Sequence, residues 1–252
     1  PEVSQGTLQA IFEFQTLMTE LTGMDISNAS HYDGATAAAE AANLAYHFFR
    51  GKRKNILVSR AVHPQYRETI RTYMQGQEDI KVIGDENDAE LAVDLQQLTE
   101  NIDNNTALVV VQYPDFFGRI HDYTKLIENA HADGALVCMI FNPTALGLIK
   151  TPGEYGADIA VGDGQPLGIP LSFGGPYLGI FTCKEKYVRK LAGRLVGETV
   201  DEEGKRAYVL TLTAREQHIR REKSTSNICT NQGLMALAAA IHLSLLGKTG
   251  FQ

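Results

Sequence analysis

The sequence has no excess of basic residues, no signal-peptide pattern and no apolar run that we expect to be long enough to cross a bilayer. Its 252 residues include 23 Lys and Arg against 30 Asp and Glu, a formal net charge of -7. A nucleic-acid site needs clustered positive charge, so this balance disfavours nucleic acid as a partner. We therefore expect no nucleic-acid and no membrane partner, and a cytoplasmic location.

Cysteine is also scarce. Cys138, Cys183 and Cys229 are odd in number, far apart and in no metal-ligand spacing. We predict buried thiols in a reducing cytosol and no metal site, with a lone catalytic thiol as the alternative. The sequence further lacks a Gly-x-Gly-x-x-Gly turn after a strand and a Walker loop, which disfavours a nucleotide-dependent enzyme.

What is present is typical of a soluble α/β protein, with 44% apolar and 21% charged residues. Apolar spacing predicts helices over residues 5–23, 37–49, 65–75, 88–101, 123–133, 184–195 and 231–246. Apolar and β-branched runs predict strands over residues 55–59, 80–83, 106–112, 135–141, 158–161 and 178–182. Strands that alternate with helices and are apolar throughout indicate a mostly parallel sheet between two helical layers, a three-layer αβα sandwich.

The remaining segments suggest one large domain over residues 1–252. Residues 198–208 are charged and contain Gly204, so we expect a solvated loop or hairpin there. The chain begins at Pro1 without a methionine and stops just after a helical pattern, which suggests an excerpt of a longer protein.

A first candidate site is the turn Gly34, Ala35 and Thr36 after Asp33, at the start of the helix predicted at 37–49. Free backbone N–H groups at such a turn bind anions, and a glycine lets a ligand approach closely. Plain helix capping by Asp33 or Thr36 is the alternative.

Three further candidates follow predicted strands. His63 would stack on a planar ligand or occupy a turn or interface, and Asn142 ends the strand at 135–141. Gln165 follows the strand at 158–161 and precedes a Gly-rich segment, where pyridoxal-phosphate enzymes of the aspartate-aminotransferase type carry the Schiff-base lysine. Such enzymes also need a carboxylate near position 142, yet no Asp or Glu occurs between Gly134 and Pro152. The two absences together indicate an inactive cofactor site.

The last candidate is the hydroxyl-rich segment 224–227, preceded by basic residues from Arg220. One interpretation is a helix N-cap behind a basic surface. The other is a loop directed at a phosphate, with positive charge nearby.

These motifs, in this order, resemble the glycine cleavage system P-protein family, and in particular its lysine-less subunit 1. The segments that carry the resemblance are 1–6, 32–37, 59–64, 170–176 and 215–221, together with Gln165. The resemblance implies the large domain of the fold-type-I pyridoxal-phosphate architecture, without the family's N-terminal extension and C-terminal small domain.

The resemblance also implies a division of labour. Subunit 2 would hold pyridoxal phosphate on its lysine, and the pair would decarboxylate glycine and pass the aminomethyl group to the lipoyl arm of the H-protein. Two such pairs would form a dimer of heterodimers. In related enzymes a Gly-Thr-x-Asn loop reaches the partner's cofactor phosphate, so Thr225 and Asn227 are expected to act in trans, with Ser224 replacing the glycine.

Under this interpretation no residue of this chain is catalytic and no cofactor is covalently bound to it. Gly34, Ala35, Thr36, His63, Asn142 and Gln165 would line a vestigial pocket. A purely structural or regulatory scaffold subunit is the main alternative. A lysine-independent pyridoxal enzyme is disfavoured by Asn142 as well as Gln165. Left alone, the bare interface is expected to favour self-association.

Overall fold

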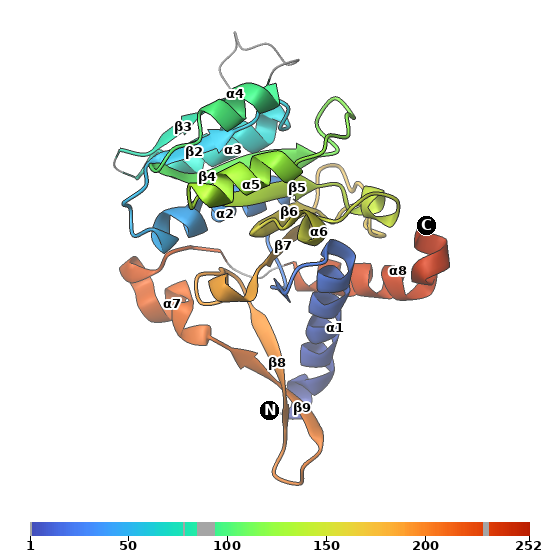
Figure 1. Cartoon of the computed structure of the whole chain (residues 1–252). Helices are drawn as coiled ribbons and strands as arrows, with labels where there is room; N and C mark the ends of the chain where they lie inside the picture. Colours follow the sequence, from blue (N-terminus) through green and yellow to red (C-terminus); the bar gives the residue numbers. More distant parts are fainter. Residues whose placement is uncertain (1, 78, 85–93, 229–231) are drawn as a thin grey trace.

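The computed structural model describes all residues except 1, 78, 85–93 and 229–231. Its centre is a seven-stranded sheet with the order β1-β7-β6-β5-β4-β2-β3 (Figure 1). Its strands are β1 (Ile26–Ser27), β2 (Asn55–Val58), β3 (Lys81–Ile83), β4 (Thr106–Tyr113), β5 (Leu136–Phe141), β6 (Ile159–Asp163) and β7 (Gly179–Cys183). Strands β2 to β6 run parallel, whereas β7 is antiparallel to β6 and to β1.

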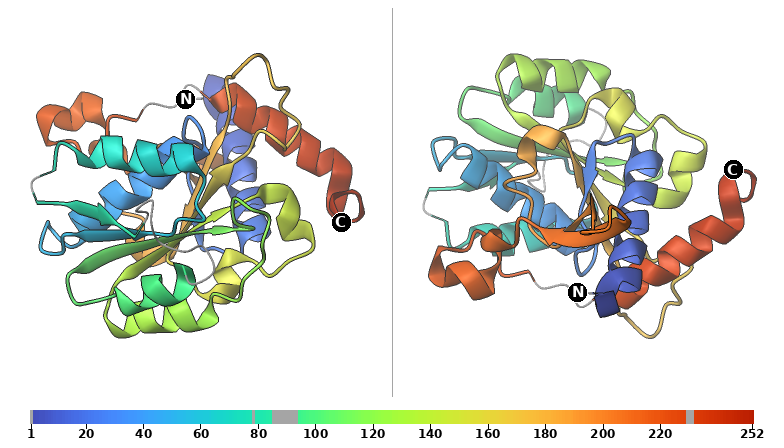
Figure 2. Two further views of the ribbon diagram at one scale, coloured as in Figure 1. Left: turned by 90° about the horizontal axis from the view of Figure 1, so that it is seen from above. Right: turned by 90° about the horizontal axis from the view of Figure 1, so that it is seen from below.

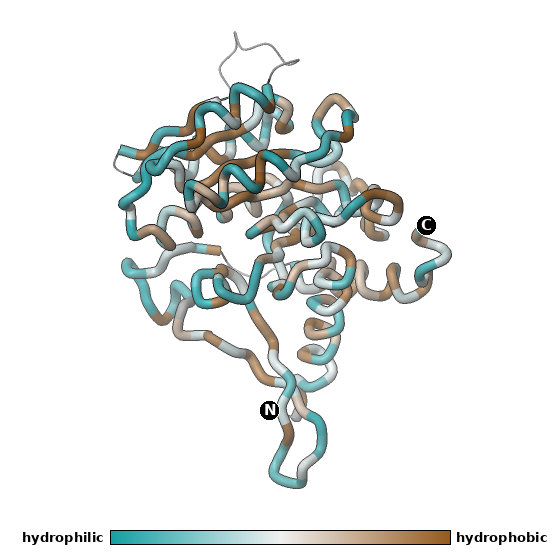
Figure 3. Tube along the Cα trace, in the orientation of Figure 1, coloured by the Kyte–Doolittle hydropathy of each residue, from teal (hydrophilic) through white to brown (hydrophobic). Residues whose placement is uncertain are grey.

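The central strands are apolar because both of their faces are covered. All six residues of β5 are buried, as are seven of the eight in β4, and the tube coloured by hydropathy is brown along these strands (Figure 3). The predicted mostly parallel, doubly covered sheet is therefore confirmed.

Helices form the outer layers. The helices are α1 (Gln5–Thr22), α2 (Gly34–Phe48), α3 (Pro64–Met74), α4 (Asp94–Glu100), α5 (Thr124–Ala132), α6 (Pro152–Tyr155), α7 (Gln217–Arg220) and α8 (Gly233–Phe251). The short α7 has no buried residue and lies outside these layers (Figure 1). Alternate strand residues face opposite layers: Val110 packs with α2 and α3, and Val109 with α4 and α5. The view from above shows the sheet between these two layers (Figure 2), which confirms the αβα sandwich.

Two parts of the sequence prediction are corrected. The helix expected at 184–195 is only the 3-10 turn Glu185–Tyr187, because Gly193 has φ 83° and an alternating strand begins at Leu195. Strand β1 was not predicted, since its two residues give no periodic signal. The first part of the helix expected at 88–101 lies outside the described residues, and α4 covers the rest.

The segment expected to be a loop or hairpin is a hairpin, formed by β8 (Leu195–Val200) and β9 (Arg206–Thr211). It projects from the body beside α1 (Figure 1). Leu8 of α1 packs there against Val196 and Tyr208. The Gln15 amide donates to the Val196 carbonyl at 3.0 Å and accepts from its N–H at 2.9 Å.

Cys138 and Cys183 are buried free thiols in the sheet. Burial raises the pKa of the Cys138 thiol, which keeps it protonated and unreactive. The prediction of buried thiols is confirmed for these two residues, and Cys229 lies outside the described residues.

Helix α8 corrects one expectation about apolar runs. It has 19 residues and a mean hydropathy of 1.4, enough by length and composition to cross a membrane, and only 17% of that stretch is buried. One such helix is weak evidence for a membrane span. Ala236, Ala239 and Ala240 pack into the core, while Leu234 and Leu245 are exposed.

His31 fixes the chain at the sheet edge just before α2. Its N–H donates to the Gly179 carbonyl at 2.9 Å and its ring stacks on Phe181, with centroids 5.0 Å apart. The ring is fully buried, and its nitrogens have no partner in the described part of the chain. Burial lowers the pKa of His31 from 6.5 to about 3.

This burial predicts acid sensitivity. The unfolded chain takes a proton on His31 below pH 6.5 while the folded chain does not until about pH 3, so stability falls as pH falls through that window. At pH 5.5 the free energy of unfolding should be about 1.4 kcal/mol lower from this group than at pH 8. Denaturant unfolding at both pH values should show a pH-dependent loss of stability in the parent protein that is smaller by about this amount in His31→Phe.

The exposed His218 provides the control. A His218→Phe variant should keep the full pH difference. If His31→Phe retained the same acid sensitivity as the parent, the buried neutral ring would not be its source.

Candidate functional site

A cavity of about 280 Å³ opens at the carboxyl edge of the sheet. It is lined by His63, Tyr66, Gln112, Ile140, Phe141, Asn142, Pro143, Asp163, Gln165, Pro166 and Tyr177. The predicted residues His63, Asn142 and Gln165 thus come together, because each follows a parallel strand of the same sheet and such strands end at one edge.

The predicted polar side chains of this cavity are already hydrogen-bonded within the chain. His63 Nδ1 accepts from the Gln65 N–H at 3.2 Å, and Asn142 Oδ1 accepts from the Thr144 N–H at 3.0 Å. Gln165 Nε2 donates to the Ile169 carbonyl at 2.6 Å. Burial, followed by the charge of Arg67, lowers the pKa of His63, so its ring is neutral near pH 7. These contacts serve local turns of the backbone.

The turn at Asp33 is a complete capping box. Asp33 Oδ1 accepts from the Thr36 N–H at 2.7 Å, and the Asp33 N–H donates to the Thr36 hydroxyl at 3.2 Å. The capping alternative therefore describes these residues, and two of the groups that would have held an anion are engaged.

Gly34, Ala35 and Thr36 are not among the residues that line the cavity, which differs from the expected pocket. The Gly34 N–H donates to Asp163 Oδ2 at 3.2 Å, and a Cβ on Gly34 would lie 2.0 Å from the Tyr66 hydroxyl. Tyr66 and Asp163 therefore stand between this turn and the cavity. Burial raises the pKa of Asp163, the N–H groups of Gln165 and Gly34 oppose that shift, and Asp33 adds to it.

Pyridoxal phosphate does not fit these residues. Position 165 offers an amide in place of an amine, and position 142 offers no charge to a pyridine nitrogen. At the start of α2, where a phosphate would find free N–H groups, the carboxylates of Asp33 and Asp163 accept the bonds instead. Two acidic groups there would also repel a phosphate dianion.

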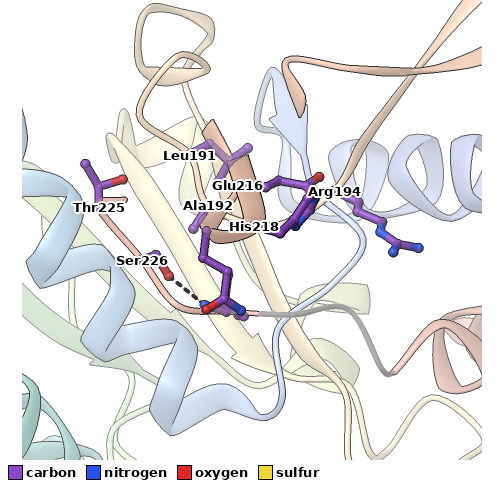
Figure 4. Close-up of a pocket in the computed structure, with 10 residues that line it drawn as sticks. Leu191, Ala192, Arg194, Glu216, His218, Thr225 and Ser226 are labelled. Atoms are coloured by element: carbon purple, nitrogen blue, oxygen red, sulfur yellow. Dashed lines mark hydrogen bonds and ion pairs between the residues drawn. The ribbon is translucent and has the colours of Figure 1, made fainter. Parts of the chain in front are cut away.

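The segment 224–227 lies elsewhere, against the middle of α2. Asn43 Nδ2 of that helix donates to the Thr225 carbonyl, and the Ser226 hydroxyl donates to Glu40 Oε1 at 2.7 Å. Ser224 has φ -68°, an ordinary value, so this conformation does not require the glycine of the Gly-Thr-x-Asn pattern. Thr225 and Ser226 also lie along a smaller cavity of about 100 Å³ (Figure 4).

Two polar side chains of this segment remain available. Within the described residues, the Thr225 hydroxyl and the Asn227 amide group make no hydrogen bond, and both residues line an open polar cavity of about 530 Å³. That cavity shares no lining residue with the one at the sheet edge. The exposed Arg220, Arg221 and Lys223 precede the segment and place positive charge beside it.

Sequence reasoning missed four residues that shape these sites: Glu40, Asn43, Tyr66 and Asp163. Two of them, Glu40 and Asp163, have features in the sequence that could have pointed to them. Glu40 is the only Asp, Glu, Lys or Arg in an otherwise Ala-rich helix, and Asp163 ends an apolar strand. Asn43 and Tyr66 are ordinary in their segments, and only the fold reveals their contacts.

Comparisons with known proteins decide the family. The sequence profile of the glycine cleavage system P-protein matches residues 1–252. The chain belongs to this P-protein family. It is 56% identical over its whole length to the probable glycine dehydrogenase (decarboxylating) subunit 1 of Desulforamulus reducens, and 54% identical to that of Brevibacillus brevis. It spans 56% and 55% of those proteins, about half of their length.

Solved structures agree with this assignment. A glycine decarboxylase (P-protein) in inhibitor-bound form matches with a TM-score of 0.89 and 47% identity, over all of this chain and 56% of that one. A sphingosine-1-phosphate lyase from Burkholderia pseudomallei matches with a TM-score of 0.61 at 15% identity, over 98% of this chain and 56% of that one. The second likeness shows the fold alone, which is that of fold-type-I pyridoxal-phosphate enzymes.

The misfit of the P-protein cofactor with the sheet-edge cavity predicts that restoring the lysine is not enough. In Gln165→Lys an amine is present, but Asp33 and Asp163 still accept from the backbone N–H groups at the start of α2, and Asn142 remains uncharged. We expect no visible absorbance band on adding pyridoxal phosphate, and no mass increase at Lys after borohydride reduction. Stoichiometric reductive labelling at position 165 would show that the pocket still accepts the cofactor.

Proposed function

We propose that this chain is part of subunit 1 of a glycine dehydrogenase (decarboxylating). With subunit 2 it would decarboxylate glycine and pass the aminomethyl group to the lipoyl arm of the H-protein. The full-length match to the P-protein family and the identity to subunits of that name support this role. A cytoplasmic dimer of heterodimers is part of the proposal.

The proposal places pyridoxal phosphate on subunit 2 and none on this chain, which would be inactive alone. The misfit of the sheet-edge cavity supports this division. When bound, the cofactor supplies the electron sink for decarboxylation. The residues of this chain would complete its binding site from across the interface.

Thr225 and Asn227 are the residues proposed to reach that cofactor, by donating to its phosphate in trans. One observation carries this assignment: in the described part of the chain their side chains have no hydrogen-bond partner, yet their segment is held in place by α2 and does not line the sheet-edge cavity. Arg220, Arg221 and Lys223 would add attraction for a phosphate.

A scaffold subunit that contributes no active-site residue is the second candidate. The exposed apolar side chains of α8, including Leu234, Ile241 and Leu245, favour a role in which the chain binds a partner protein through an apolar surface. Both candidates require the chain for activity, so only changes at the 224–227 segment separate them.

The trans assignment predicts that Thr225→Val weakens cofactor binding in the purified complex with subunit 2. A hydrogen bond to a charged phosphate contributes about 1.5–3 kcal/mol, so the dissociation constant should rise roughly 10- to 100-fold. Absorbance titration of the cofactor-free complex measures it.

Thr225→Ser is the matched control, because it keeps the hydroxyl and should retain near-parental affinity. Analytical ultracentrifugation should show the same assembly for both variants. Unchanged affinity in Thr225→Val would refute the phosphate contact and leave the scaffold role.

A further inference from the structure

Glu40 is placed where a charge is costly. It has 6% of its surface exposed and lies among alanines of α2 that are fully buried, including Ala39 and Ala41. No basic side chain of the described chain forms an ion pair with it. An apolar residue here would stabilise the helix better, since buried ionisable groups carry a desolvation cost. The position therefore has a role other than packing.

Both oxygens of Glu40 are used to hold another segment. Oε1 accepts from the Ser226 hydroxyl at 2.7 Å, and Oε2 accepts from Asn43 Nδ2 at 3.2 Å. Asn43 Nδ2 also donates to the Thr225 carbonyl. The carboxylate thus holds Ser226 directly and Thr225 through Asn43, across more than 180 positions of sequence.

The Ser226 hydroxyl extends this network along the segment. While donating to Glu40, its oxygen accepts from the Ile228 N–H at 3.1 Å, and the Ser224 hydroxyl donates to the Ser226 carbonyl at 2.6 Å. The groups of the segment that take part in these bonds are serine hydroxyls and backbone groups. Within the described residues the Thr225 hydroxyl and the Asn227 amide group have no hydrogen-bond partner, although the backbone of their segment is anchored.

We propose that Glu40 is a positioning residue, which orients the segment 224–227 so that Thr225 and Asn227 can meet the phosphate of the partner's cofactor. This inference rests on the proposed function of that segment. It also explains how a serine at position 224 serves where related loops have glycine, because the conformation is imposed from α2.

The test is a double-mutant cycle in the complex with subunit 2. Glu40→Ala and Ser226→Ala should each raise the pyridoxal-phosphate dissociation constant roughly tenfold, since each removes a buried hydrogen bond that orders the segment. The double variant should lose less affinity than the sum of the two single losses, because both variants break the shared Glu40–Ser226 hydrogen bond. Additive losses, or unchanged affinity in both singles, would overturn the proposal.

A second variant covers the case in which Glu40→Ala does not fold. Glu40→Gln keeps an oxygen that can accept from the Ser226 hydroxyl, but its NH2 group then faces the NH2 group of Asn43, and two donors cannot bond to each other. Asn43 cannot rotate to avoid this without breaking its hydrogen bond to the Thr225 carbonyl. Glu40→Gln should give an intermediate loss of affinity. Glu68→Gln on α3, an exposed residue that removes the same charge, should leave affinity unchanged.

A readout without cofactor separates positioning from general stability. Amide hydrogen exchange at residues 225–228 of the cofactor-free complex should quicken in Glu40→Gln, while exchange in β4 and β5 stays the same. Uniformly faster exchange would assign Glu40 a merely structural role. Unchanged cofactor affinity in Thr225→Val would refute the proposed phosphate contact, and with it the positioning role of Glu40. Weaker binding in Thr225→Val with unchanged affinity in the Glu40 variants would refute the positioning role alone.

Discussion

The burial of α2 is the constraint on which both sites depend. Six of its seven alanines are fully buried against the central strands and α3, and small side chains let the helix backbone approach the sheet closely. With the helix held in this way, its first turn is fixed beside Asp163 and its middle beside residues 225 and 226. One rigid element therefore determines what the sheet-edge cavity can accept and what the distant segment can present.

The two sites use their polar groups in opposite ways. At the sheet edge, Asp163 and Asn142 satisfy backbone groups of this chain, and the start of α2 is already capped by carboxylates. At the 224–227 segment the chain is held by α2, whereas the Thr225 and Asn227 side chains have no hydrogen-bond partner among the residues that the structure describes. Under the proposed function, the first site would exclude the cofactor phosphate and the second would bind the phosphate of the partner subunit's cofactor.

The long apolar runs predicted the fold because they depend on local sequence: 106–112 and 135–141 became β4 and β5 within one or two residues. The helix expected at 184–195 failed where Gly193 breaks the backbone. His63, Asn142 and Gln165 could be grouped, since parallel strands end at one edge. The roles of Glu40 and Asp163 could not, because their partners Ser226 and Gly34 lie 186 and 129 positions away.

The most direct measurement is a titration of pyridoxal phosphate into the purified chain alone and then into its complex with subunit 2. We expect no visible absorbance band with the chain alone and a stoichiometric band with the complex, located on subunit 2 by borohydride reduction and peptide mass analysis. A stoichiometric, reducible band on a lysine of this chain alone would contradict the division of labour derived from Gln165, Asn142 and Asp163.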